Sequence, residues 1–153
     1  MPETDVTLSP AELSDRLGAI PGSTEVRARP DGLWMSAPEL DVPAMGREMT
    51  TLGFRLCTMT GLPADGGETT VIYHWVRADH AAHAVHLKTC TRGGALPSLA
   101  TTVRPASWSE REIHDFFGAT FTGHPNLAPL LRPASLKEGF FRDAPAAAAP
   151  AEE

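Results

Sequence analysis

The sequence contains no long run of apolar residues and only two cysteines, and each shortage excludes a class of protein. No apolar segment approaches the roughly 18 residues that a membrane-crossing helix needs. The N-terminus carries acidic residues where a secretory signal would carry basic ones. We therefore expect a cytosolic protein in which Cys57 and Cys90 stay reduced, and in which any contact with a membrane passes through a partner.

Basic residues are also scarce, since 13 Lys and Arg stand against 19 Asp and Glu for a formal net charge of −6, and no basic cluster occurs along the chain. A nucleic-acid partner is not expected, because its phosphates are bound by clustered basic side chains. The sequence has neither a G-x-G-x-x-G nor a P-loop pattern, so nucleotide binding has no support. Two separated cysteines supply no iron–sulfur site. We expect no cofactor in this chain.

What the chain does contain is typical of one globular domain. It has 153 residues, of which 42% are apolar and 21% charged, enough to bury a sizeable core. The last stretch, residues 144–153, is rich in Ala and Pro and has no large apolar residue, so we expect disorder there. The predicted organisation is a single domain over residues 1–143 followed by that tail.

The periodicity of apolar residues predicts an α+β fold. Two helices are expected in the N-terminal half, over residues 10–18 with a Ser9/Glu12 capping box and from a cap at Asp41 to about residue 53. Alternating patterns predict strands over residues 24–29, 33–35, 54–60, 69–78 and 83–91. Short links favour antiparallel neighbours, and the largely apolar 69–78 strand should be central. We predict a mostly antiparallel sheet packed by the two helices, then a short C-terminal helix and an extended docking segment.

The densest grouping of charged, aromatic and turn residues lies at 105–133, and we expect any function to lie there. Ser107 and Glu110 have the spacing of a capping box, which predicts a helix that begins at Ser107 and ends at residue 117. Arg111 and Asp115 stand four residues apart and are expected to pair on its surface.

A glycine follows this predicted helix at the position where a left-handed backbone is needed, so Gly118 should end it. Residues 119–122 have the pattern of a short strand, and residues 123–126 have the composition of a turn. The local structure predicted for the stretch is a surface that docks on something else.

Two sets of residues suggest catalysis or metal binding. His80, His83 and His86 recur every three residues, but on a strand neighbours of that spacing point to opposite faces, so we interpret them as structural. Glu110, Glu112, His114 and Asp115 are the residue types of a general acid–base set. We favour capping and ion pairing on an interface helix for them. A free-standing metalloenzyme that uses the histidines and these carboxylates is kept as a remote alternative.

The 105–133 stretch resembles the signature of the C subunit, also called the thirty-kilodalton subunit, of proton-translocating NADH:quinone oxidoreductase, respiratory complex I. That signature is close to A-x-W-x-E-R-E-x-x-D-x-F-G-x-x-F-x-G-H-P-x-L. The matching residues are Ala106, Trp108, Glu110, Arg111, Glu112, Asp115, Phe117, Gly118, Phe121, Gly123, His124, Pro125 and Leu127. The resemblance covers roughly residues 52–143 and includes Tyr73-His74 and Pro97-Ser98.

The resemblance implies a non-catalytic subunit of the peripheral arm that binds no iron–sulfur cluster, flavin or nucleotide itself. Such a subunit packs against the large subunit that forms the quinone pocket with its iron–sulfur small subunit, and reaches the cytoplasmic side of the membrane only through the complex. The signature residues from Trp108 to Pro125 would then form the docking surface. Iron–sulfur clusters, quinone or a nickel-iron centre are expected in the partners.

Two departures from the family pattern leave the parent complex open. His114 stands where members commonly carry Tyr, and residues 136–143 only partly match the usual C-terminal motif. These variants look similar to the related subunits of energy-converting nickel-iron hydrogenases and formate hydrogenlyases. A subunit of such a complex is therefore the alternative interpretation.

Overall fold

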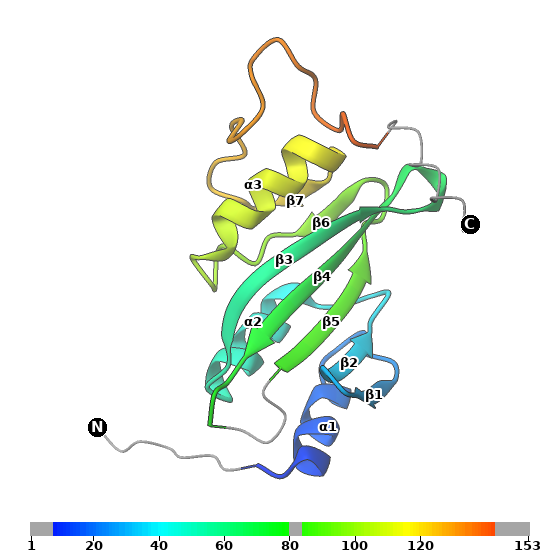
Figure 1. Ribbon diagram of the computed structural model, residues 1–153, viewed down its shortest axis with the longest axis vertical. Helices are drawn as coiled ribbons and strands as arrows, with labels where there is room; N and C mark the ends of the chain where they lie inside the picture. The colour runs from blue at the N-terminus through cyan, green and yellow to red at the C-terminus, as the bar shows by residue number, and fades with distance from the viewer. Residues whose placement is uncertain (1–7, 80–83, 143–153) are drawn as a thin grey trace, which may run out of the picture.

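The computed structural model describes residues 8–79 and 84–142, and Figure 1 shows their arrangement. In chain order the elements are α1 (Pro10–Gly18), β1 (Val26–Arg29), β2 (Gly32–Ser36), α2 (Val42–Thr51), β3 (Arg55–Pro63), the 3-10 turn η1 (Asp65–Gly67), β4 (Thr69–Val76), β5 (Ala84–Cys90), β6 (Ala95–Pro97), α3 (Ala106–Phe117) and β7 (Thr120–Thr122). The predicted tail, His80 and His83 lie outside the described residues.

Five strands form one mixed sheet in the order β1-β2-β5-β4-β3. Its neighbouring pairs are antiparallel except β2 and β5, which run parallel because the chain between them passes through α2, β3 and β4 and so has room for a crossover. The predicted α+β class with a mostly antiparallel sheet is confirmed. The predicted 69–78 strand is β4, which pairs on both sides as expected, although β5 holds the middle place.

One face of this sheet carries the hydrophobic core. Val71, Tyr73 and Trp75 of β4 are fully buried and point to the same side, because alternate residues of a strand share a face. The helices pack onto this cluster with Leu13 and Leu17 from α1, Val42, Met45 and Met49 from α2, and Ile113 from α3. Burial of each such side chain contributes about 1.5–3 kcal/mol before entropy is subtracted. The three helices therefore share one face of the sheet.

The first two helices begin where local sequence predicts. Ser9 N–H donates to Glu12 Oε2 at 2.8 Å, and Glu12 N–H donates to Ser9 Oγ at 3.3 Å, which completes the capping box of α1. Asp41 caps α2 by accepting a hydrogen bond from Ala44 N–H at 2.9 Å. These bonds join residues three apart, so no tertiary contact is needed to place the helix starts.

The chain after β5 packs at one end of the main sheet and adds a second, two-stranded sheet. β6 and β7 pair in parallel, with α3 between them in sequence and beside β3 in space (Figure 1). After β7 the chain turns at residues 123–126 and passes back over α3; we call residues 127–142 the strap. None of the helices within residues 8–79 and 84–142 combines the length and apolarity required to cross a bilayer.

Candidate docking site

The inner side of α3 packs directly on the sheet. Ala106 is fully buried, Ile113 is 3% exposed, and Phe117 lies against Gly61 of β3. A Cβ atom at Gly61 would stand 2.7 Å from Phe117 Cδ2, closer than carbon atoms can approach, and 3.1 Å from Ile113 Cγ2. The absence of a side chain at Gly61 therefore sets how closely the helix seats on β3.

The predicted capping box at the start of α3 is wrong. The helix begins at Ala106 with Pro105 as its cap residue, and no side chain caps it. A preceding turn, in which Ala106 N–H donates to Val103 O at 2.9 Å, starts the helix earlier and places Ser107 inside the first turn. Ser107 Oγ instead lies 3.1 Å from His124 Nε2. Tertiary contacts thus replaced the local cap.

Glu110 belongs to a buried polar cluster rather than to the helix start. Its side chain is fully buried and accepts hydrogen bonds from Ser98 Oγ and from Leu99 N–H, both at 2.6 Å. Burial raises the pKa of Glu110 to about 7, and the hydrogen bonds from Ser98 and Leu99 partly oppose that rise. The carboxyl ties α3 to the segment that follows β6.

His124 lies against the same carboxyl, with its Nε2 atom 3.7 Å from Glu110 Oε2 and its side chain fully buried. Asn126 N–H donates to His124 Nδ1 at 2.9 Å, so the ring proton sits on Nε2, where Ser107 O is 3.3 Å away. Burial lowers the pKa of His124, the largest of the effects on it. The imidazole therefore joins the turn after β7 to the first turn of α3.

Asp115 faces away from the sheet, yet its side chain is fully buried because the strap covers it. The carboxylate accepts from the N–H groups of Leu130 and Leu131 at 2.8 Å each and of Arg132 at 3.2 Å, and from Arg132 Nε at 3.1 Å. Burial acts to raise the pKa of Asp115, but the three backbone donors and Arg132 outweigh it and lower that pKa. The carboxylate therefore holds the strap on α3 in its charged form.

The predicted Arg111–Asp115 ion pair is also wrong, because the strap supplies the hydrogen-bond partners of both side chains. Arg111 Nε and Nη2 donate to Ala128 O and Pro129 O, each at 2.9 Å. Both side chains stand on the outer side of α3, but the strap offers each a more complementary set of backbone groups than they offer one another. Their function in the structure is to hold the strap.

The far end of α3 is closed by Gly118 and by Gly139, Phe140 and Phe141 of the strap, and the sequence had singled out only Gly118. Gly118 ends the helix with φ 70°, as predicted, and it faces Gly139 so closely that a Cβ atom added at Gly118 would lie 3.5 Å from Gly139 Cα. Gly139 N–H donates to Asp115 O at 2.9 Å. The ring of Phe116 meets those of Phe140 and Phe141 with centroids 5.4 and 4.9 Å apart. The sequence did contain a signal for this contact, since residues 136–143 partly match the usual C-terminal motif of the family.

The predicted docking residues thus divide into two groups. Those that are buried or that hold the strap are Glu110, Arg111, Asp115, Phe117, Gly118, Phe121 and His124. Those that are exposed are Trp108, Glu112, Gly123 and Pro125. Trp108 is 67% exposed on the outer side of α3, one turn before the part that the strap covers. Exposed apolar side chains of the strap are Leu131, Leu136 and Phe141, at 59%, 39% and 46%.

The acidic residues and His114 do not converge as an acid–base set. Glu110 and Asp115 have separate hydrogen-bond partners on opposite sides of α3, Glu112 is exposed, and His114 Nδ1 donates to Ala119 O at 2.9 Å. Over residues 8–79 and 84–142, no group of three or more His, Cys, Asp or Glu side chains is placed to hold a metal ion. The arrangement is suited to shaping a surface.

The chain matches the family model described as the respiratory-chain NADH dehydrogenase 30 kDa subunit, over residues 40–148. It is 43% identical over 75 residues to the C/D subunit of the NADH-quinone oxidoreductase of Methylococcus capsulatus, a match that covers 48% of this chain and 12% of that protein. It is 47% identical over 60 residues to the corresponding C subunit of Chlorobium phaeobacteroides, covering 38% of this chain and 36% of that one. These matches thus span about a third or less of each relative's length.

Two solved structures share the fold. A chain of the membrane-bound sulfane sulfur reductase, an archaeal respiratory membrane complex, superposes with a TM-score of 0.63 at 23% identity, over 73% of this chain and 69% of that one. The trypsin-resistant fragment of Nqo5 superposes with a TM-score of 0.56 at 24% identity, over 69% and 90%. At these identities the likeness establishes the fold.

Proposed function

Because the chain belongs to the family of the respiratory-chain NADH dehydrogenase 30 kDa subunit, we propose that it is a non-catalytic structural and assembly subunit of an NADH:quinone oxidoreductase-type complex. It would sit in the hydrophilic arm of that membrane-bound complex and dock on the large subunit that forms the quinone site. The docking surface is the outer side of α3 together with the strap.

The exposure of Trp108 is the observation that carries this proposal. A tryptophan that is 67% exposed beside a well-packed layer leaves a large apolar surface in water. Aromatic side chains of this kind are the commonest energetic centres of protein interfaces, where their loss costs about 2 kcal/mol or more. Phe121, also in the signature, is 1% exposed and already used in the core.

The buried signature residues support docking indirectly. Asp115 and Arg111 hold the backbone of the strap, so they determine where Leu131 is presented beside α3. Glu110 connects α3 to the segment after β6, and His124 connects the turn after β7 to α3. A surface organised in this way before binding loses less conformational entropy when a partner arrives.

We expect no redox centre in this protein itself. Its acids are occupied by donors within the fold, as Glu110 is by Ser98 and Leu99, which supports a structural role for them. Electron transfer would belong to the large subunit and its iron–sulfur small subunit. We place the protein on the cytoplasmic side of the membrane, peripheral and held there through the complex.

A second candidate is the equivalent subunit of an energy-converting nickel-iron hydrogenase or formate hydrogenlyase. The protein shares its fold with a chain of the membrane-bound sulfane sulfur reductase, so this fold also occurs in a respiratory membrane complex other than NADH:quinone oxidoreductase. That occurrence supports this candidate. His114, which replaces the usual Tyr of complex I members, also favours it. Purification from native membranes separates the two, because flavin and NADH oxidation accompany one complex and nickel accompanies the other.

The docking role is tested by replacing Trp108 with Ala in the tagged full-length chain. We expect recovery of the large subunit from native membranes to fall by about tenfold or more, because an interface tryptophan contributes roughly 2 kcal/mol or more. The matched control is Arg47→Ala, which trims another long exposed side chain, on α2. Circular dichroism should show both variants folded, because neither side chain is in the core.

Two results would contradict the proposal. One is recovery of the wild-type chain as a lone monomer from solubilised membranes. The other is undiminished recovery of the large subunit with Trp108→Ala, which would exclude the outer side of α3 as the docking surface.

A further inference from the structure

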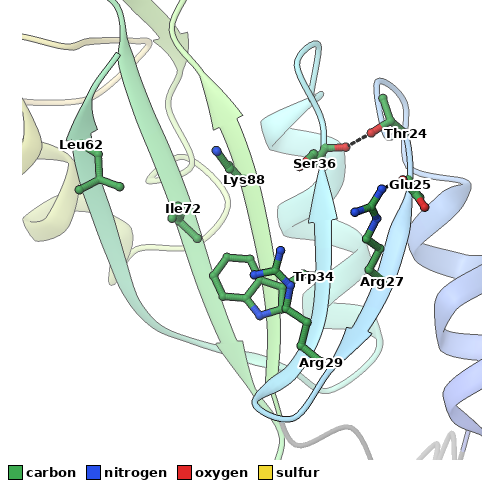
Figure 2. Close-up of a pocket in the computed structure, with 9 residues that line it drawn as sticks. All are labelled: Thr24, Glu25, Arg27, Arg29, Trp34, Ser36, Leu62, Ile72 and Lys88. Atoms are coloured by element: carbon green, nitrogen blue, oxygen red, sulfur yellow. Dashed lines mark hydrogen bonds and ion pairs between the residues drawn. The ribbon is translucent and has the colours of Figure 1, made fainter. Parts of the chain in front are cut away.

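The face of the sheet opposite the core carries a groove lined by side chains from all five strands. Figure 2 shows Arg27 and Arg29 of β1, Trp34 of β2 and Lys88 of β5 pointing into it. Leu62 of β3 and Ile72 of β4 line its other end. The cavity measures about 350 Å³. It lies on the side of the sheet away from the three helices, so the docking surface on α3 does not include it.

Positive charge is concentrated in this groove, although the whole chain is acidic. Arg27, Arg29 and Lys88 line it together with one carboxylate, Glu25, on a chain whose formal net charge is −6. Glu25 pairs with Arg27 at 2.7 Å. Within the described residues neither Arg29 nor Lys88 has a carboxylate within ion-pairing distance. Neither cation is held in an ion pair, although Arg29 lies near enough to the Asp31 carboxylate to lower the pKa of Asp31, so both can still interact with a negatively charged ligand.

Trp34 forms a fixed platform in the middle of the groove. Its Nε1–H donates to Asp31 Oδ1 at 3.0 Å, which sets the plane of the indole. The guanidinium carbon of Arg29 lies 4.7 Å from the indole centroid, within the range of a cation–π contact. The ring of His86 lies 4.5 Å from it. Because neighbours already hold the indole, a ligand would not have to order it.

The end of the groove opposite the arginines is apolar. Leu62 is 46% exposed and stands beside Ile72, which is 8% exposed. Neighbouring strands lie about 4.8 Å apart, so β1 and β3 are separated by roughly 19 Å across the sheet. An extended peptide advances about 3.3 Å per residue and would cross that distance in roughly six residues.

We propose that this groove binds an acidic, extended peptide segment of a second polypeptide. Carboxylates of the segment would meet Arg29 and Lys88, and an apolar side chain several residues away would cover Leu62. The charge complementarity selects the acidic peptide over a neutral one. A nucleic acid fits less well, because its evenly spaced phosphates need a continuous basic track and find an apolar end here instead.

The test uses the purified full-length chain and fluorescein-labelled peptides measured by fluorescence polarisation. The probe is a Glu-rich peptide with one Leu near an end, and its counterpart replaces each Glu by Gln. We expect the Glu peptide to bind about tenfold or more tightly than the Gln peptide. Binding should weaken as the ionic strength rises from about 0.01 M to about 1 M, because the Debye length falls from about 30 to about 3 Å.

Charge reversal in the groove should remove this preference. Arg29→Glu or Lys88→Glu should weaken binding of the Glu peptide about tenfold, and the double variant further. The matched control, Arg47→Glu on α2, reverses an exposed cation on the helical side and should leave binding unchanged. Trp108→Ala should also leave it unchanged, so failure of the docking role on α3 and failure of this proposal are distinguishable.

Three results would overturn the proposal. They are equal binding of the Glu and Gln peptides, an effect of Arg47→Glu as large as that of Arg29→Glu, and binding of a single-stranded DNA oligonucleotide at least as tight as that of the Glu peptide. The last result would assign the groove to nucleic acid instead.

Discussion

Replacement of Asp115 by Ala should release the strap from α3. The carboxylate has no exposed surface and accepts four hydrogen bonds, three from the backbone of residues 130–132 and one from Arg132 Nε. Alanine at this position removes all four acceptor contacts at once. It also leaves the Arg132 guanidinium, 12% exposed, without this carboxylate partner.

The loss of stability depends on whether the hydrogen-bond donors left without Asp115 can bind water instead. Removal of one partner from a buried ion pair typically costs about 3–5 kcal/mol. Here the donors belong to a strap at the surface, where Leu131 is 59% exposed, so they regain water once the strap lifts. We therefore expect the lower end of that range, about 3 kcal/mol in the free energy of unfolding. Asp115→Asn keeps an acceptor oxygen but loses the charge, for which we expect about 1–2 kcal/mol.

Urea denaturation of the full-length chain measures the global change, and hydrogen exchange of the amides of residues 130–132 measures the local one. Glu112→Ala is the matched control, since it removes an exposed acid from the same helix and should change stability by less than about 0.5 kcal/mol. In Asp115→Ala the three strap amides should lose their protection. Unchanged protection, together with a stability equal to that of wild type, would refute the assignment of Asp115 as the anchor of the strap.

The pH dependence gives the same carboxylate an independent test. The pKa of Asp115 is lowered from its ordinary value of 3.8, so its contribution is present above that value and is lost as pH falls through the lowered folded-state pKa. Asp115→Asn should lack this component of acid unfolding. If it denatures in acid with the same pH dependence as wild type, the charged form of Asp115 does not stabilise the fold.

Two further predictions concern the packing of α3. Burial raises the pKa of Glu110 to about 7 from an ordinary 4.5, so the wild type should lose about 3 kcal/mol of stability as pH rises from 4.5 through 7. In urea denaturation at a series of pH values, Glu110→Gln should abolish this pH dependence. An unchanged pH dependence would contradict the raised pKa of Glu110. Gly61→Ala should lower stability by about 1–3 kcal/mol in thermal denaturation, because the added Cβ would lie 2.7 Å from Phe117. Gly18→Ala is the control and should not lower stability, because no atom lies within 4 Å of a Cβ added there. Equal effects of the two substitutions would exclude the close packing of α3 on β3.

The parts of the fold that depend on local chemistry could be predicted from the sequence. α1 occupies the predicted residues because Ser9 and Glu12 satisfy each other's backbone within one turn. The strands follow from alternation, and the short links between β3, β4 and β5 impose antiparallel pairing. The parallel pairing of β2 with β5 could not be predicted, because it joins segments that local pattern does not relate.

The candidate site shows the same division. The signature marked the candidate region, but it did not reveal which of its residues are buried. Glu110 has the spacing of a helix cap to Ser107, yet its partner is Ser98, because folding brings the segment after β6 against α3. Asp115 was predicted to pair with Arg111, and the strap supplies stronger partners to both.

The sequence by itself determined the helix starts, the alternating strands, the family signature and the overall acidity, because each depends on neighbours in the chain or on composition. Only the tertiary structure decided which signature residues are internal anchors and left Trp108 exposed beside them. It also created the basic groove, which no run of the sequence contains, by placing Arg29 of β1 and Lys88 of β5 on one face of the sheet. Burial and electrostatic fields depend on distances in space, and those distances exist only after the chain has folded.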